Sequence, residues 1–242
     1  MSNDKIHCET HGEQQGICLC RHLLSGEKQG FNCTFDEDAP YELRPAAWCD
    51  QCEGLYQQEG DCTDDFLAFV DGKVVCACCY DEIRERNWLQ DDDLLHDLIC
   101  ESFAYLDEKQ KAFLDKYKLR EHNRWDWDQE RCKLLFSHDG VPQVEADIHF
   151  SGSYSEKSET WLWAWANDSL LEPIKKASQD IKTLGENLGL KQLEAAMWSA
   201  TDVDGWEMTS VMAKHMNAIG AYRTHCDSGY TYMVVTAARW LN

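Results

Sequence analysis

The residues best suited to chemistry in this 242-residue chain are its cysteines, and ten of the 13 lie within the first 79 residues. Two Cys-x-x-Cys pairs are present: "WCDQCE" carries Cys49 and Cys52, and "VCACCYDEI" carries Cys76 and Cys79. Such a turn can present two sulfurs to one tetrahedral metal ion. The chain has the character of a cytosolic protein, and a reducing compartment such as the cytosol keeps thiols free. The cysteines therefore favour metal ligation or redox chemistry over disulfides. The two pairs together predict one zinc site of four sulfurs.

A second group of candidate ligands lies in "CETHGEQQGICLCRHL". Cys8 and His11 form a Cys-x-x-His turn. Cys20 and His22 are separated by one residue, so on a strand their side chains would point the same way. The set that we favour for a second zinc site is Cys8, His11, Cys20 and His22. Cys18 or Cys33 could replace one member. The alternative is a single metal ion with these residues packed beside it.

Both predicted sites are closed, because four protein ligands leave no position for water. A closed zinc site stabilises a fold and does not activate a nucleophile. Neither Cys-x-x-Cys pair lies in a βαβ pattern, which disfavours a thioredoxin-like redox role. A first pair on a turn, a hairpin, and a second pair at the entry to a helix resemble the arrangement of treble-clef zinc folds.

The charge of the chain is strongly negative, with 44 acidic against 23 basic residues and a net charge of −21. Residues 1–88 alone hold 18 acidic and 7 basic residues. An acidic surface repels phosphate backbones, so the charge disfavours a nucleic-acid partner. It favours a basic protein partner, whose encounter it would accelerate.

The periodicity of the apolar residues predicts three segments: a zinc-binding module at 1–88, a connecting helical segment at 89–123 and an α+β domain at 124–242. In the last segment we expect two strands joined by a tight turn at "DG", a third strand in "ETWLWAWAN" and a final hairpin around "DSG". Helices are expected at 169–185, closed by Gly185, at 190–202 and at 206–220, with "TDVDGWE" as a helix connection. This order indicates an antiparallel sheet packed on helices, in the α+β class.

Three tryptophans alternate along the expected strand "TWLWAWAN", which places Trp161, Trp163 and Trp165 on one face. They could form the aromatic floor of a ligand pocket or partner groove. Alternatively, this face is the core beneath the helices.

The sequence offers no recognisable catalytic set. It lacks a Gly-rich phosphate loop, a nucleophile elbow and a His-Glu-x-x-His motif, and its histidines are dispersed. It also lacks a run of 18 apolar residues and a signal-like start, so we expect neither membrane insertion nor export and predict a cytoplasmic location.

Several motifs bring a resemblance. "CETHG", "CRHL", "WCDQCE" and "VCACCYDEIRERN" resemble the Cys-x-x-His-Gly, Cys-x-His-Leu, Trp-Cys-x-x-Cys-Glu and Cys-x-x-Cys-Tyr-Asp series of uncharacterised bacterial zinc-binding proteins. "TWLWAWAN" is similar to the motif of a separate uncharacterised bacterial family. The resemblance implies a bacterial, cytoplasmic protein with one or two structural zinc ions, and it implies no activity.

These observations predict an acidic binding protein that neutralises or regulates a basic protein partner. Immunity proteins, which neutralise secreted toxins, are acidic for the same physical reason. The alternative is an enzyme or ligand sensor that uses a Trp-lined pocket in the C-terminal domain.

Overall fold

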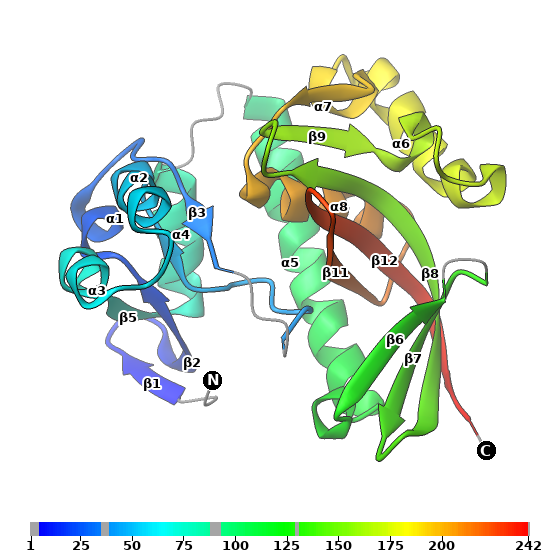
Figure 1. Cartoon of the computed structure of the whole chain (residues 1–242), viewed down its shortest axis with the longest axis horizontal. Coiled ribbons are helices and arrows are strands. Elements are labelled where there is room, and N and C mark those ends of the chain that lie inside the picture. The colour runs from blue at the N-terminus through cyan, green and yellow to red at the C-terminus, as the bar shows by residue number, and fades with distance from the viewer. Residues whose placement is uncertain (1–4, 35–38, 88–92, 129–130, 242) are drawn as a thin grey trace. The chain divides into compact units, whose positions relative to one another are not determined.

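The computed structural model describes residues 5–34, 39–87, 93–128 and 131–241. The chain divides into two compact units, Met1–Asp91 and Asp92–Asn242, whose elements are labelled in Figure 1. Helices and largely antiparallel sheets occur in both units, which confirms the predicted α+β class. The boundary expected at residue 88 lies outside the described residues. The helix expected to act as a separate connector is part of the second unit.

Over its described residues, the first unit contains a sheet of five short strands built around β2 (Gly12–Leu19). This strand pairs antiparallel with β1 and β5 and pairs in parallel with β4, which in turn pairs with β3. A glycine at φ 70° starts β2, where the left-handed backbone of the β1–β2 turn favours a residue without Cβ. The other strands are β1 (Lys5–Cys8), β3 (Asn32–Cys33), β4 (Ala47–Trp48) and β5 (Lys73–Cys76).

In the described part of this unit, four helices accompany the sheet: α1 (Arg21–Ser25), α2 (Asp50–Glu59), α3 (Asp64–Val70) and α4 (Ala77–Asn87). The apolar core beneath them is small. One part is an aromatic group in which the rings of Trp48, Tyr56 and Phe66 lie 5.5 Å apart pairwise. Asn87 and Arg86 of α4 donate to carbonyls of α1, among them the Leu23 carbonyl at 3.0 Å from Asn87. Short elements with so little core need additional stabilisation.

The second unit contains a seven-stranded antiparallel sheet, curved into a half-barrel, with the 15-residue strand β8 at its centre. Over its length β8 pairs with β7, β9 and β12, and β6, β10 and β11 lie at the edges. The strands are β6 (Arg124–Asp128), β7 (Lys133–His138), β8 (Val141–Ser155), β9 (Thr160–Trp163), β10 (Met197–Ser199), β11 (Gly220–Cys226) and β12 (Gly229–Trp240).

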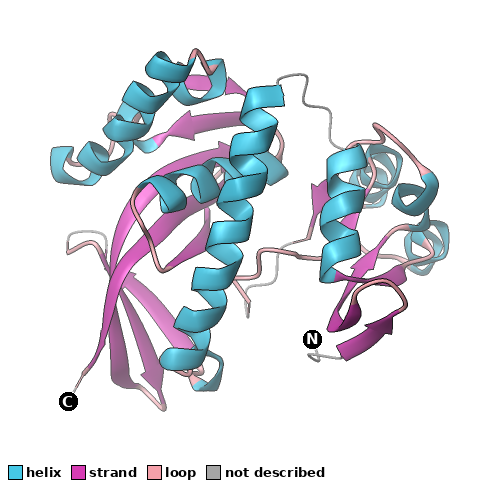
Figure 2. Ribbon diagram, turned by 180° about the vertical axis from the view of Figure 1, so that it is seen from behind, coloured by secondary structure: helices cyan, strands magenta, loops and turns pink. Residues whose placement is uncertain are grey.

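Helices α5 and α8 pack on the sheet (Figure 2). Helix α8 is buried along nearly its whole length, and α5 contributes Gln110, whose side chain bonds both the N–H and the carbonyl of Ala221 at the edge strand β11. A covered edge strand is protected from pairing with another chain. The helices are α5 (Asp93–Lys116), α6 (Glu172–Leu188), α7 (Lys191–Glu194) and α8 (Asp202–His215), with short 3-10 turns η1 (Leu119–Glu121) and η2 (Ala164–Ala166).

Both predicted hairpins of this unit are present. Asp139 and Gly140 have φ of 48° and 78°, as the tight turn between β7 and β8 requires, and β11 and β12 flank "DSG". The third strand was predicted too long. It ends at Trp163, because the N–H of Asn167 bonds the Ala164 carbonyl and closes a 3-10 turn.

The helix predictions for 169–185 and 190–202 were partly wrong. Gly185 lies inside α6, where a Cβ would come within 2.7 Å of Leu193 Cβ, so the glycine permits close approach of α7. The helix ends instead at Gly189, whose φ is 71°. Met197–Ser199, which were predicted to be helical, instead form strand β10 and pair with β9. Strand pairing overrides helix propensity at this position.

The segment "TDVDGWE" also differs from its prediction as a connection. It is the start of α8, where Thr201 and Asp204 form a capping box. Among the helices of the described residues, none has both the length and the apolar character to cross a bilayer.

Candidate metal centres

Among the described residues of the first unit, two clusters of four Cys and His side chains are present, each with its possible ligand atoms within 4.8 Å of one another. We call them the outer cluster, formed by Cys8, His11, Cys76 and Cys79, and the inner cluster, formed by Cys20, His22, Cys49 and Cys52. The eight predicted ligands are therefore all found in clusters. Their partition differs from the prediction, because the two Cys-x-x-Cys pairs belong to different clusters.

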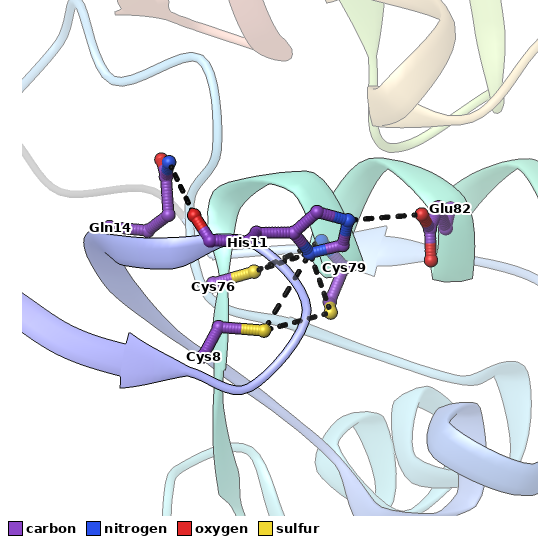
Figure 3. Close-up of polar contacts among 6 residues, drawn as sticks. All are labelled: Cys8, His11, Gln14, Cys76, Cys79 and Glu82. Carbon is purple, nitrogen blue, oxygen red and sulfur yellow. Dashed lines mark hydrogen bonds and ion pairs between the residues drawn. The ribbon is translucent and has the colours of Figure 1, made fainter.

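The outer cluster has the spacing of a tetrahedral site. Nδ1 of His11 lies 3.6 Å from Cys8 Sγ, 3.4 Å from Cys76 Sγ and 3.5 Å from Cys79 Sγ (Figure 3). Cys8 Sγ and Cys79 Sγ are 3.9 Å apart. In a tetrahedral site with metal–sulfur bonds of about 2.3 Å and metal–nitrogen bonds of about 2.0 Å, the S–S separation is about 3.8 Å and the S–N separation about 3.5 Å. The observed distances fit a single central ion.

Three elements position the outer cluster. Cys8 ends β1 and His11 lies in the turn to β2, while Cys76 ends β5 and Cys79 lies in the first turns of α4. The pairing of β2 with β5 brings the turn onto the start of the helix, since Gly16 is opposite Cys76. A hairpin turn facing a helix N-terminus resembles the arrangement of treble-clef zinc folds, which the motifs predicted for a different set of four residues.

The inner cluster is built at two helix starts. Cys20 is the N-cap of α1 and Cys49 the N-cap of α2, and each helix adds one further ligand in its first turn. Sγ of Cys49 and Cys52 are 3.7 Å apart, and Nδ1 of His22 lies 3.2 Å from Cys52 Sγ. The backbone N–H of Cys49 donates to Cys20 Sγ at 3.3 Å. This cluster also suits one tetrahedral ion.

The strand β2 explains the partition. Its N-terminal end follows Cys8 and His11, and its C-terminal end leads directly into Cys20. An eight-residue strand is about 26 Å long at about 3.3 Å per residue. The two early pairs therefore lie at opposite ends of β2 and cannot share an ion. Each instead meets one later Cys-x-x-Cys pair.

The thiols of both clusters have perturbed acidities. Hydrogen bonds from the backbone of His11 and Thr10 lower the pKa of the Cys8 thiol to about 6. Burial, followed by hydrogen bonding to the neighbouring thiols, raises the pKa of Cys79 to about 12. Burial also raises the pKa of Cys20 and Cys52 above the ordinary cysteine value. Several thiolates this close repel one another, and a divalent cation would offset that repulsion.

The clusters differ in their surroundings. Cys20, Cys49 and Cys52 of the inner cluster are at most 1% exposed, whereas only Cys76 of the outer cluster is buried to that degree. Behind the outer cluster, Nε2 of His11 lies 3.6 Å from the carboxylate of Glu82 (Figure 3). A carboxylate behind a metal-binding histidine fixes the ring and strengthens the ligand. His22 instead has Arg21 Nε at 3.4 Å from its Nε2.

Glu82 was not identified by the sequence analysis. The available signal was its position three residues after Cys79, which places both side chains on one face of α4. Cys18 and Cys33, the alternative ligands, belong to neither cluster. Cys18 lies exposed on β2, and Cys33 Sγ lies 3.8 Å from the Tyr80 hydroxyl.

The tryptophan motif is divided between core and surface. Trp161 and Trp163 are fully buried, with ring centroids 5.4 Å apart, and Trp163 Nε1 donates to the Gln192 carbonyl at 2.7 Å. Gly152 makes room for Trp161, since a Cβ there would lie 2.4 Å from the indole. Trp165 lies on η2, half-buried, with Lys182 Nζ 5.1 Å from its ring centre. The three rings therefore do not share one strand face, and the two on β9 belong to the core.

Comparison with known proteins gives one family match. A model described as a family of unknown function (DUF6882) matches residues 96–238, from within α5 to near the end of β12. The matched segment lies in the second unit and does not include the two clusters. No curated protein and no solved structure matches the chain.

Proposed function

The chain belongs to the DUF6882 family, and we propose that it is a zinc-containing bacterial protein that binds and regulates a basic protein partner. The proposal of zinc binding depends on the tetrahedral spacing of two separate Cys3His sets. The proposal of a basic partner depends on the acidic charge of the chain.

Zinc is the metal that the ligand chemistry favours. Three thiolates and one imidazole at tetrahedral spacing suit Zn²⁺, whereas Mg²⁺ and Ca²⁺ prefer oxygen ligands and higher coordination. With four protein ligands, each ion would serve as a structural link between elements of the first unit. Each bound Zn²⁺ leaves its Cys3His set with a net charge of about −1, which adds to the acidity of the module.

Metal analysis of the purified chain tests the zinc proposal. We expect two zinc ions per chain, and one per chain in Cys76→Ser and in Cys49→Ser, which remove one ligand from different clusters. Cys226→Ser is the matched control, because this exposed cysteine lies in the second unit, and it should keep two. Zinc-free protein after purification in a reducing, chelator-free buffer would contradict the proposal.

The basic partner is supported by how the acidic residues are placed. Residues 45–72 hold seven Asp or Glu and no Lys or Arg. Those at the end of α2 and around the start of α3 are exposed: Glu59, Asp61, Asp64 and Asp65. A surface that carries charge of one sign attracts a partner of opposite charge and raises its association rate. A toxin is one such partner, by analogy with acidic immunity proteins.

The partner proposal is tested by affinity capture from the native bacterium, followed by measurement with the identified partner. We expect a partner of basic isoelectric point whose association rate falls steeply as salt rises. Replacing the four exposed acids by amides should slow association by about tenfold or more. A matched control replaces four exposed acids of the second unit, which are Glu108, Asp115, Asp180 and Asp227. Equal effects of both variants, or binding independent of salt, would remove the electrostatic basis.

The proposal includes a cytoplasmic location, because the six proposed cysteine ligands are best kept reduced in a reducing compartment. The competing idea of a Trp-lined pocket loses its main support, since Trp161 and Trp163 are fully buried.

A further inference from the structure

The outer cluster combines the zinc-binding geometry with solvent access. Cys8, His11 and Cys79 are half-buried, and 22% of the His11 side chain is exposed. In the inner cluster all three sulfurs are buried among α1, α2 and β4. Thiolates react with peroxides according to their exposure, so a small oxidant can reach the outer sulfurs far more readily.

The two accessible sulfurs of the outer cluster are also neighbours. Cys8 Sγ lies 3.9 Å from Cys79 Sγ, and a disulfide bond of about 2.05 Å requires them to approach by about 2 Å. Cys8 ends β1, the outermost strand of its sheet, which pairs only with β2 in the described part of the chain. An edge strand with one neighbour can make a shift of this size.

We propose that Cys8 and Cys79 form a peroxide-sensitive thiol pair whose oxidation releases the metal ion of the outer cluster and leaves the inner ion bound. The inference rests on the proposed zinc content. Beyond the proposed zinc binding, Cys8 and Cys79 would be a site of oxidative modification, and the oxidant would be hydrogen peroxide or a small alkyl hydroperoxide.

The chemistry balances over two steps. The Cys8 thiolate attacks one oxygen of hydrogen peroxide, the O–O bond breaks, and hydroxide leaves with the formation of a sulfenic acid. The Cys79 thiolate then attacks the sulfenic sulfur, forming the S–S bond and expelling a second hydroxide. The two sulfurs supply the two electrons that reduce the peroxide, and each hydroxide takes a proton to become water.

Oxidation removes two of the four ligands. His11 and Cys76 remain, and two ligands cannot hold a structural zinc ion. The new disulfide joins β1 to α4 across 71 residues of sequence, so it replaces the metal link with a covalent one. The inner cluster has a similarly close pair, Cys49 and Cys52 at 3.7 Å, but both sulfurs are buried. Access, and not sulfur separation, therefore distinguishes the clusters.

The test uses the full chain loaded with zinc, with the stoichiometry measured first. Hydrogen peroxide is added in the presence of a chromophoric zinc chelator, and released zinc is followed with time. We expect one zinc per chain to be released at least about tenfold faster than the other, since reactivity follows thiolate exposure. Peptide mapping should show a Cys8–Cys79 disulfide, and thiol reductant with zinc should restore two ions per chain.

Two variants separate this pair from general oxidation. Cys8→His keeps four ligands in the outer cluster but removes the thiol pair, so it should bind two zinc ions and slow the fast release. Cys20→His makes the matched change in the inner cluster and should leave the fast release unaltered. Equal release from both clusters, a Cys49–Cys52 disulfide as the first product, or unchanged fast release in Cys8→His would overturn the inference. If the initial measurement found no zinc before peroxide was added, the proposed function would also be overturned. That measurement therefore distinguishes a failure of the zinc proposal from a failure of the thiol-pair inference.

Discussion

The two units of this protein reach a stable fold by different means. The first unit has short strands, helices of 5 to 11 residues and a small aromatic core, and its elements converge on eight Cys and His side chains. The second unit buries a helix of 14 residues against a sheet whose central strand has 15. With the proposed zinc ions bound, the first unit would depend on metal ligation for its stability, whereas the second unit depends on apolar burial.

Metal removal should produce the largest difference in stability between the two units. Structural zinc contributes about 10–16 kcal/mol of apparent binding free energy, so a strong chelator should unfold the first unit and leave the second folded. Hydrogen exchange located by peptide should show loss of protection confined to residues 5–87. Eight of the ten tryptophans lie in the second unit, so the fluorescence maximum should barely move. Simultaneous loss of protection in both units would contradict this division.

A substitution in the core of the second unit should have the opposite effect, destabilising that unit and leaving the first unit intact. Trp161 is fully buried against Trp163 and Tyr232, at ring distances of 5.4 and 5.5 Å. Trp161→Ala should lower the free energy of unfolding of the second unit by about 3–5 kcal/mol. Zinc content should stay at the wild-type value. Trp240→Ala, which removes a ring that is 46% exposed, should have a much smaller effect on the same urea transition.

The second unit should also show a pH dependence from Asp204. Burial raises the pKa of this carboxyl to about 6 against an ordinary 3.8, although Thr201 donates to it from its N–H at 2.6 Å. A carboxyl with a raised folded pKa keeps its proton in the folded state, so its contribution is complete below pH 4 and is lost as pH rises toward 6. The loss is on the order of 2–3 kcal/mol, at about 1.4 per unit of pKa shift.

Urea unfolding of the second unit at pH 4, 5, 6 and 7, followed by tryptophan fluorescence, measures this contribution. Asp204→Asn should flatten the decline between pH 4 and 6, because the amide keeps an acceptor for Thr201 and cannot ionise. Asp180→Asn, on an exposed residue of α6, should leave the pH profile unchanged. A wild-type profile that rises over this range would contradict the raised pKa.

The same contrast explains what the sequence could reveal. The sequence identified all eight members of the two clusters, because Cys-x-x-Cys and Cys-x-x-His turns are local and their chemistry is specific. The "DG" turn and the "DSG" hairpin were predictable for the same reason. Local spacing does not determine which turn faces which, since that depends on β2 pairing with β4 and β5 over more than 25 residues of sequence. The two clusters were therefore partitioned wrongly.

In the second unit, errors occurred where long-range packing overrides local preference. Strand β10 lies in a segment of helix-forming residues and exists because β9 offers it a partner. Gly185 resembles a helix end but serves the approach of α7, and Gly189 ends the helix. The sequence placed Trp161 and Trp163 on one face, but it left open whether that face is pocket or core, and their complete burial in the fold shows that it is core.

The smallest effect should come from an ordinary helix cap in the first unit. Thr63 is the N-cap of α3, where its Oγ1 accepts from the Phe66 N–H at 3.1 Å. Thr63→Ala should cost about 1 kcal/mol, a typical cap contribution, and Thr63→Ser should preserve it. With cobalt in place of zinc, the thiolate-to-metal absorption band reports unfolding of the first unit alone in urea. If Thr63→Ala shifted that transition as much as the loss of a ligand does, local packing and not metal ligation would dominate the stability of the first unit.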